Sequence, residues 1–386
     1  MGLAYLSLGK MFVKEGDEAS RQVDSKFGAS VRQRAMELQR RHSWKTQGRG
    51  AQFMRGGALW GATPETSELP VSINGISRGF SDGELFYSLI TPEISGLFAV
   101  RDGLKEEQRL LHTSDFWVRE ICASKSAQKL AFVMAHRDGT SSIAVIGANG
   151  DDMAEVTQGD SVDQAPSWVP GSATVILFQS AGIGRNQAGI AVGRGPFLVE
   201  KLNLEDGSIQ TVAEEDGFDL LVPRQASDGS LWFIKRPYTP PNAKAHPFKV
   251  LLDFALFPFR LLFAVFQFLN FFSAKYTGKF LVTQGGARQR EADVRQMMIW
   301  GNMIEAAKQG GNDDEETPAL VPGNWQLVRQ KPDGTREAVA NGVVSFDLEA
   351  DGSVVYSNGR AIYRRSDTGE STRLDRGEFI LQVVSF

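Results

Sequence analysis

The residues that most often carry chemistry are few and scattered along this chain. Its four histidines, His42, His112, His136 and His246, stand far apart and form no HExxH or Cys/His spacing for zinc. A Gly-x-Ser-x-Gly nucleophile motif is also missing from the sequence. The sequence therefore predicts no enzyme, no metal site and no cofactor.

Three further features resemble functional sites only loosely. Cys122 ends a strand-like stretch, residues 116–122, where a buried structural thiol is expected. Residues 182–189 (GIGRNQAG) have a glutamine where a dinucleotide loop has its third glycine, which favours a plain loop between strands. Residues 312–316 (NDDEE) lack the alternating ligand spacing of a calcium loop and are typical of a solvated linker.

Asp-Gly and Asn-Gly dipeptides recur along the chain and predict tight hairpins, because both residue types tolerate the left-handed backbone of a type I′ turn. Strand-like runs follow many of them, for example residues 84–90, 141–146, 231–234 and 354–356. The clearest dipeptides are Asp82-Gly83, Asp138-Gly139, Asn149-Gly150, Asp206-Gly207, Asp228-Gly229, Asp333-Gly334, Asp351-Gly352 and Asn358-Gly359.

Aligned on these turns, the chain divides into units of about 45 residues, the length of a four-stranded propeller blade. We therefore predict an all-β fold, a β-propeller of about six blades. Two β-sandwiches would share the hairpins but should not keep this period. The expected units are residues 73–117, 118–163, 164–220, a unit from 221, residues 343–386, and a further unit from residues 41–72.

One strand-turn-strand segment resembles a known repeat. Residues 164–171 (QAPSWVPG) followed by residues 175–178 (VILF) are similar to the repeat of TolB-like and WD40-like propellers, and residues 80–87 and 226–233 echo it. The resemblance covers about residues 73–235 and 320–386 and implies a fold, not a function. TolB proteins are periplasmic, with a signal peptide and a separate N-terminal domain. Neither is expected here, so the TolB role does not transfer.

One blade is interrupted by a segment of different chemistry. After residues 231–234, a proline cluster at residues 237–241 should stop the sheet, and strand patterning resumes near residues 324–330. Between them, residues 248–272 (FKVLLDFALFPFRLLFAVFQFLNFF) hold nine of the 25 phenylalanines. At helical spacing their polar residues share a narrow stripe, so we expect an amphipathic helix that Pro258 kinks or splits.

A single membrane crossing is disfavoured for this segment. Both of its flanks should return to one blade, and therefore to one side of any bilayer. The other candidate crossing, residues 288–308, contains Arg290, Glu291, Asp293, Arg295 and Glu305, which are costly in hydrocarbon. We expect instead an in-plane or shallow re-entrant helix that contacts a membrane or a membrane-protein partner. A helix packed on the propeller flank or in an oligomer interface is the alternative.

Charge placement agrees with this expectation. Residues 1–60 carry a net charge of +6 and residues 241–308 carry +5. Because the whole chain has a net charge of −4, the remaining residues together carry −15. Basic residues near anionic headgroups favour membrane binding. The acidic body would repel a phosphate backbone, so nucleic acid is not an expected partner.

Residues 18–41 show helical spacing of apolar side chains, which predicts an N-terminal helical arm over residues 1–42. The propeller is then expected over residues 43–386, with the helical insertion at residues 239–318. Residues 1–13 lack a basic start and contain Lys10, which makes a secretory signal peptide unexpected.

The expected function is a non-catalytic scaffold or accessory subunit, attached peripherally on the cytoplasmic face of a membrane or membrane-protein complex. A ligand sensor or enzyme using the central channel and a soluble homo-oligomer remain alternatives. The expected membrane- or partner-binding residues are Phe248, Leu251, Leu252, Phe254, Phe257, Phe259, Leu262, Phe263, Phe266, Phe268, Leu269, Phe271 and Phe272, with basic residues Lys249, Arg260, Lys275 and Lys279 beside them.

Overall fold

The computed structural model of this protein describes residues 2–16, 18–42, 71–101, 106–240, 296–299, 302–305 and 317–386. The chain forms two compact units. The first comprises Met1–Tyr238 and Gly310–Phe386, and the second comprises Thr239–Gln309. The described part of the second unit is a hairpin of β19 (Gln296–Ile299) and β20 (Asn302–Glu305).

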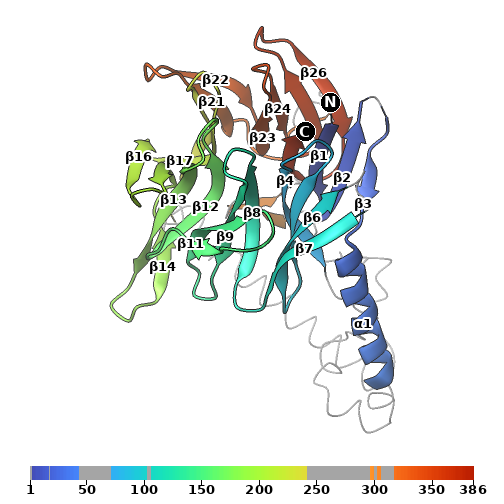
Figure 1. Cartoon of the computed structure of the whole chain (residues 1–386). Coiled ribbons are helices and arrows are strands. Elements are labelled where there is room, and N and C mark those ends of the chain that lie inside the picture. Colours follow the sequence, from blue (N-terminus) through green and yellow to red (C-terminus); the bar gives the residue numbers. More distant parts are fainter. Residues whose placement is uncertain are drawn as a thin grey trace, which may run out of the picture. The chain divides into compact units, whose positions relative to one another are not determined.

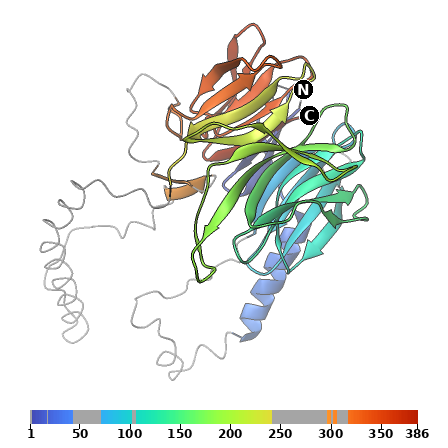
Figure 2. The ribbon, with the colours of Figure 1, turned by 90° about the vertical axis from the view of Figure 1, so that its left-hand side faces the viewer.

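The first unit consists of antiparallel sheets built from strands that follow one another along the chain (Figures 1 and 2). Within its described residues the strands fall into six groups of four, with one additional strand in the fourth group. The first three groups contain β27 (Ile380–Ser385), β1 (Gly2–Ser7), β2 (Lys10–Glu15) and β3 (Arg21–Val23); β4 (Ser72–Arg78), β5 (Leu85–Ile90), β6 (Ser95–Arg101) and β7 (Glu106–Thr113); and β8 (Trp117–Ser124), β9 (Lys129–Ala135), β10 (Ser141–Gly147) and β11 (Ala154–Glu155).

The other three groups continue the pattern. A single parallel pairing of Ser141 with Val162 joins the third group to the fourth. The fourth also carries β14 (Ala191–Arg194), which extends a long hairpin with β13. These groups contain β12 (Ser161–Trp168), β13 (Val175–Arg185), β15 (Leu198–Asn203) and β16 (Ile209–Ala213); β17 (Phe218–Gln225), β18 (Leu231–Pro237), β21 (Gln326–Gln330) and β22 (Arg336–Asn341); and β23 (Ser345–Leu348), β24 (Val354–Ser357), β25 (Ala361–Arg365) and β26 (Ser371–Arg376).

The first strands of the six groups form a closed ring. β27 contacts β4, β4 contacts β8, β8 contacts β12, β12 contacts β17, β17 contacts β23, and β23 contacts β27. This is the arrangement of a β-propeller, with each group of strands as a blade and these six strands around the centre. The predicted all-β propeller fold is confirmed.

Packing between neighbouring blades provides the core. A buried phenylalanine occupies the second strand of four successive blades, as Phe86, Phe132, Phe178 and Phe233, each less than 2% exposed. Each packs against apolar side chains of an adjacent blade. Burial of one such side chain contributes about 1.5–3 kcal/mol. These repeated contacts hold the blades in the ring.

The turn chemistry read from the sequence agrees with the structure. All eight predicted hairpin glycines have a positive φ, from +70° at Gly207 to +91° at Gly139. The predicted strands 84–90, 141–146, 231–234 and 354–356 correspond to β5, β10, β18 and β24. In five of the turns the Asp side chain also accepts the N–H two residues later.

The predicted N-terminal helical arm over residues 1–42 is wrong for its first half. Residues 2–23 form β1, β2 and β3, and α1 begins only at Lys26 and ends at His42. The reason is ring closure: β1 pairs with β27 along its length, and the Gly2 N–H donates to the Phe386 carbonyl at 2.8 Å, so the two termini lie together (Figure 1). This pairing covers an otherwise open sheet edge.

Helix α1 is fixed at its beginning by the propeller. Ser25 accepts the N–H of Gly28 as an N-cap, and the Glu107 carboxylate from β7 accepts the N–H groups of Lys26 and Phe27, both at 2.8 Å. Phe27 also packs on Phe98. From this anchor the helix extends away from the strands (Figure 1).

The sixth blade does not come from residues 41–72, where the sequence predicts a further unit. Most of that stretch lies outside the described residues, and the blade in that place along the ring combines β27 with β1, β2 and β3. The predicted break in the fifth group is observed, since β18 pairs directly with β21 although about 90 residues separate them in sequence. The helical insertion predicted over residues 239–318 lies almost entirely outside the described residues.

Candidate functional site

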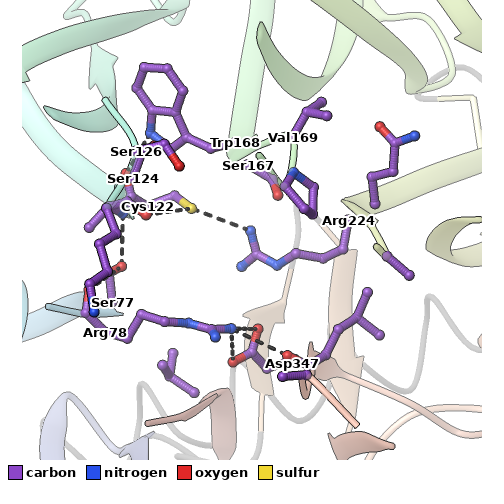
Figure 3. Close-up of a pocket in the computed structure, with 18 of the residues that line it drawn as sticks. Ser77, Arg78, Cys122, Ser124, Ser126, Ser167, Trp168, Val169, Arg224 and Asp347 are labelled. Carbon is purple, nitrogen blue, oxygen red and sulfur yellow. Dashed lines mark hydrogen bonds and ion pairs between the residues drawn. The ribbon is translucent and has the colours of Figure 1, made fainter. Parts of the chain in front are cut away.

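A cavity of about 300 Å³ lies at the end of the ring where the central strands finish (Figure 3). Every one of the six central strands contributes to its lining. The lining segments are residues 76–78, 121–126, 167–171, 224–227 and 347–350, together with Val384. Small-molecule sites in proteins are concave and combine apolar walls with a few polar groups.

The central strands are bent just before they reach the cavity. Their pairings shift register between Arg119 and Ile121 in β8, between Gln164 and Ser167 in β12, and between Leu221 and Arg224 in β17. Such β-bulges re-aim the side chains that follow them. At each bulge one residue that is not glycine has a positive φ: Glu120 at +31°, Ala165 at +51° and Val222 at +53°.

Hydrogen bonds between strands hold two of these strained positions. The Ala165 N–H donates to the Glu120 carboxylate at 2.8 Å, and the Val222 N–H donates to the Gln179 side-chain oxygen at 2.7 Å. A residue in this backbone region costs about 1–3 kcal/mol and persists only where its surroundings fix it. Each strained position is followed, two residues later, by a side chain that lines the cavity. These side chains are Cys122, Ser167 and Arg224.

One ion pair on the cavity wall ties three strands together. Nη2 of Arg78 on β4 lies 2.9 Å from Oδ2 of Asp347 on β23, and the same carboxylate accepts the N–H and the hydroxyl of Ser385 on β27. The charge of Asp347 raises the pKa of Arg78 above its usual range. Asp347 is thus fully engaged, and Arg78 is neutralised.

Arg224 is the second guanidinium of the cavity, and it has much weaker contacts. Figure 3 shows its side chain reaching from β17 toward Cys122. Nη1 lies 3.5 Å from the Pro166 carbonyl and 4.0 Å from Cys122 Sγ, both at the limit of hydrogen bonding. Nε is buried and has no acceptor. Among the described residues, no carboxylate pairs with Arg224.

Cys122 corrects one prediction and shows what sequence reasoning missed. It lies on β8 as expected and packs against the apolar cluster between the third and fourth blades, but it is only half-buried and also lines the cavity. The lining set was not predicted, because it comes from six separate strands. A partial signal is present in the sequence: Pro166-Ser167 and Pro223-Arg224 occupy corresponding places in two blades, and the residue after each proline lines the cavity.

The predicted membrane- or partner-binding residues, from Phe248 to Lys279, all lie outside the described residues, so that site stays a prediction. Of residues 182–189, the first four form the end of β13 and the last four lie in the turn that connects β13 to β14, so the segment is a hairpin of the propeller. In the described part of the chain, no three His, Cys, Asp or Glu side chains lie close enough together to hold a metal ion. The described segments also include no helix both long and apolar enough to span a membrane.

The chain is anchored firmly at the point where it leaves β18 toward the insertion. Arg236 is 0% exposed, and its Nε and Nη2 lie 2.9 and 2.8 Å from Oδ2 of Asp219, which also pairs with Arg194. Burial alone would raise the pKa of Asp219, but the hydrogen bonds of Arg194 and the charge of Arg236 lower it. Tyr238, the last residue of the unit before the insertion, donates to the Gly217 and Arg194 carbonyls.

The returning chain is fixed as well. Thr317 contacts the Tyr363 hydroxyl at 2.8 Å, and its carbonyl accepts from Asn358. Leu320 is buried, and its N–H donates to the Asn358 carbonyl at 2.8 Å. Both stems of the insertion are therefore hydrogen-bonded to the propeller.

No protein-family model and no curated protein sequence matches this chain. Solved structures do match it. TolB from Acinetobacter baumannii aligns over 99% of this chain and 66% of its own, with a TM-score of 0.51 and 10% identity. A structure of the nidogen/laminin complex aligns over 99% and 97%, with a TM-score of 0.49 and 8% identity. A putative TolB from Agrobacterium tumefaciens aligns over 82% and 86%, with a TM-score of 0.44 and 12% identity.

The closed ring of blades with a cavity at its centre defines the chain as a β-propeller. The match to TolB makes it TolB-like at the level of fold. At this identity the likeness concerns architecture alone. The chain spans 66% of the length of the TolB chain that it matches.

Proposed function

We propose that this chain is a non-catalytic scaffold or accessory subunit that the Phe-rich insertion attaches peripherally to a membrane or a membrane-protein complex, on the cytoplasmic face. The propeller then presents its loops and its central cavity to protein partners. The observation that carries the proposal is the direct pairing of β18 with β21, Leu231 opposite Gln330. An insertion that leaves and rejoins one sheet has both ends on the same side of a bilayer.

The composition of the insertion supports a lipid or membrane-protein contact. Residues 248–272 hold nine of the 25 phenylalanines, and Thr239–Gln309 is one of the two compact units of the chain. Five apolar clusters between neighbouring blades are built from described propeller residues. Large apolar surfaces outside a core mark interaction sites.

The cavity chemistry supports binding more than catalysis. Its charged groups are guanidiniums, a lysine and carboxylates that already have partners, and arginine does not act as a general base at neutral pH. Histidine is not among the lining residues. These properties suit recognition of a partner or ligand.

Fractionation of cells that express the full chain or a variant without residues 239–309 tests the attachment. We expect the full chain in the membrane fraction, where alkaline washing removes it, and the deletion variant in the soluble fraction. The thermal unfolding midpoint of the purified deletion variant checks that the propeller still folds. Equal partition of two folded proteins would overturn the proposal.

Flotation of the purified full chain with lipid vesicles then separates lipid from protein attachment. Flotation with anionic vesicles supports a direct lipid contact. Binding to native membranes alone supports a protein partner. A chain that does neither and forms a detergent-sensitive oligomer would identify the insertion as a contact between copies, contrary to the proposal.

A further inference from the structure

The central cavity has a surplus of positive charge when its ion pairs are counted. Arg78 pairs with Asp347, and Glu349 pairs with Arg364 at 2.6 Å. Two lining cations have no carboxylate partner among the described residues: Arg224 inside the cavity and Lys125 at its exposed rim. An anion entering the cavity would therefore meet an uncompensated guanidinium.

Arg224 offers hydrogen-bond donors that the protein does not use. A guanidinium has five N–H groups, and here only Nη1 has protein contacts, at 3.5 and 4.0 Å. A buried donor without an acceptor is unfavourable, and natural proteins rarely leave one in place without a reason. The bulge at Val222 holds Arg224 in this position at the expense of backbone strain.

The other residues that line the cavity indicate which class of anion it would bind. Ile76, Ile121, Val169 and Trp168 supply apolar wall, which suits a ligand with an apolar body. Ser124 accepts the N–H of Ala127 and also lines the cavity. A cavity of about 300 Å³ is at the lower end of the range for small-molecule sites.

We propose that this cavity binds an organic carboxylate, whose two oxygens pair with the guanidinium of Arg224 while its apolar body contacts the wall around Trp168 and Ile121. Planar bidentate pairing is the geometry in which arginine recognises carboxylates. A single free guanidinium fits a monocarboxylate better than a doubly charged phosphate. The inference goes beyond the attachment proposed above and does not depend on it.

The carboxylate has two possible sources, a free small molecule or the C-terminus of a peptide, and calorimetric titration of the full chain distinguishes them. The probes are 3-phenylpropionate, its neutral amide, the peptide Ala-Ala-Phe with a free C-terminus, and the same peptide amidated. We expect the free acid of one pair to bind saturably and its amide to bind at least about tenfold more weakly. The pair that binds identifies the source.

Variants link the binding to Arg224. Arg224→Gln should weaken binding of the acid at least about tenfold, and Arg224→Lys should weaken it less, because the charge remains while the fork is lost. Arg137→Gln, at an exposed arginine outside the cavity, is the matched control and should bind as the wild type does. Since Arg224 has no strong partner, its replacement should leave the thermal midpoint without ligand unchanged or higher.

Three results would overturn the inference. The first is that neither acid binds saturably. The second is that acid and amide bind equally well, so that the charge is not recognised. The third is that folded Arg224→Gln protein binds the acid as tightly as the wild type.

Discussion

Asp219 and Arg236 form an ion pair that is almost completely excluded from solvent, with 1% and 0% of their side chains exposed and 2.8 Å between Oδ2 and Nη2. The guanidinium of Arg236 also lies 4.7 Å from the centre of the Trp325 ring, on the chain that returns from the insertion. One buried cation thus joins the last residues before the insertion to the first strand region after it.

Removing the carboxylate of this pair should destabilise the propeller strongly. Asp219→Asn removes the anion that Arg236 and Arg194 share, and breaking a buried ion pair by removing one partner costs about 3–5 kcal/mol. Urea denaturation measures the change in the free energy of unfolding. Asp160→Asn, which breaks the exposed pair with Arg185, is the control and should have a much smaller effect. Similar losses for both variants would contradict the importance assigned to burial.

Asp219 should also make the free energy of unfolding depend on pH in the acidic range. The pKa of Asp219 is lowered in the folded protein, so its contribution is fully present above the unfolded value of about 3.9 and is lost as the pH falls through the lower folded value. The free energy of unfolding should therefore fall on acidification below about pH 4, and less steeply for Asp219→Asn. Parallel curves for wild type and variant would show that Asp219 does not titrate in this way.

Two hairpin glycines with the same backbone conformation should differ in their tolerance of a methyl group. Gly139 (φ +91°) has open space around the position of a Cβ, whereas a Cβ on Gly359 (φ +90°) would lie 2.5 Å from the Leu320 Cβ. Gly139→Ala should cost about 1–2 kcal/mol from the backbone alone. Gly359→Ala should cost about 1–3 kcal/mol more, because Leu320 must move. Chemical denaturation of both variants provides the comparison, and equal losses would contradict it.

Ring closure by the first strand should be sensitive to proline. Ala4 is buried between its partners Val13 and Val384, and Ala4→Pro removes a ladder hydrogen bond, which leaves a buried acceptor unpaired at a cost of about 1–3 kcal/mol. Ala19→Pro makes the same change at an exposed residue outside the strands. Thermal unfolding should show a large fall in midpoint for the first variant alone. Equal midpoints would indicate that the pairing of β1 with β27 contributes little.

Local features of the fold were predictable from the sequence, and those that depend on distant partners were not. Gly83 or Gly139 marks a turn whatever the rest of the chain does, because Asp-Gly favours a left-handed backbone at that point. Pairing of Leu3 with Ser385 joins the two ends of the chain, and no local pattern reveals it. The start of α1 depends in the same way on Glu107, which is 80 residues away from Phe27.

The candidate site was harder to predict for a related reason. Arg224, Arg78 and Cys122 come from three different blades, and only ring closure brings them to one cavity. Their orientation further depends on bulges at residues such as Val222, whose positive φ contradicts the usual preference of a β-branched residue. Repeat alignment identifies corresponding positions, but the side chains that face the centre follow from these local distortions.

The central claim is that the phenylalanines of the insertion attach the propeller to a membrane or a membrane-protein complex, and the bound fraction of matched variants tests it most directly. One variant changes Phe257, Phe263, Phe266 and Phe268 to serine. The control changes Ile190 and Val192 to serine. These side chains are 63% and 46% exposed. They belong to the β13–β14 hairpin, which Figures 1 and 2 show extending from its blade.

Burial of one phenylalanine contributes about 1.5–3 kcal/mol, so loss of four membrane-buried side chains should lower the membrane-bound ratio by about ten-thousandfold or more. The account predicts that this variant remains folded and becomes soluble while the control stays with the membrane. Retention of the folded serine variant at the wild-type level would contradict it.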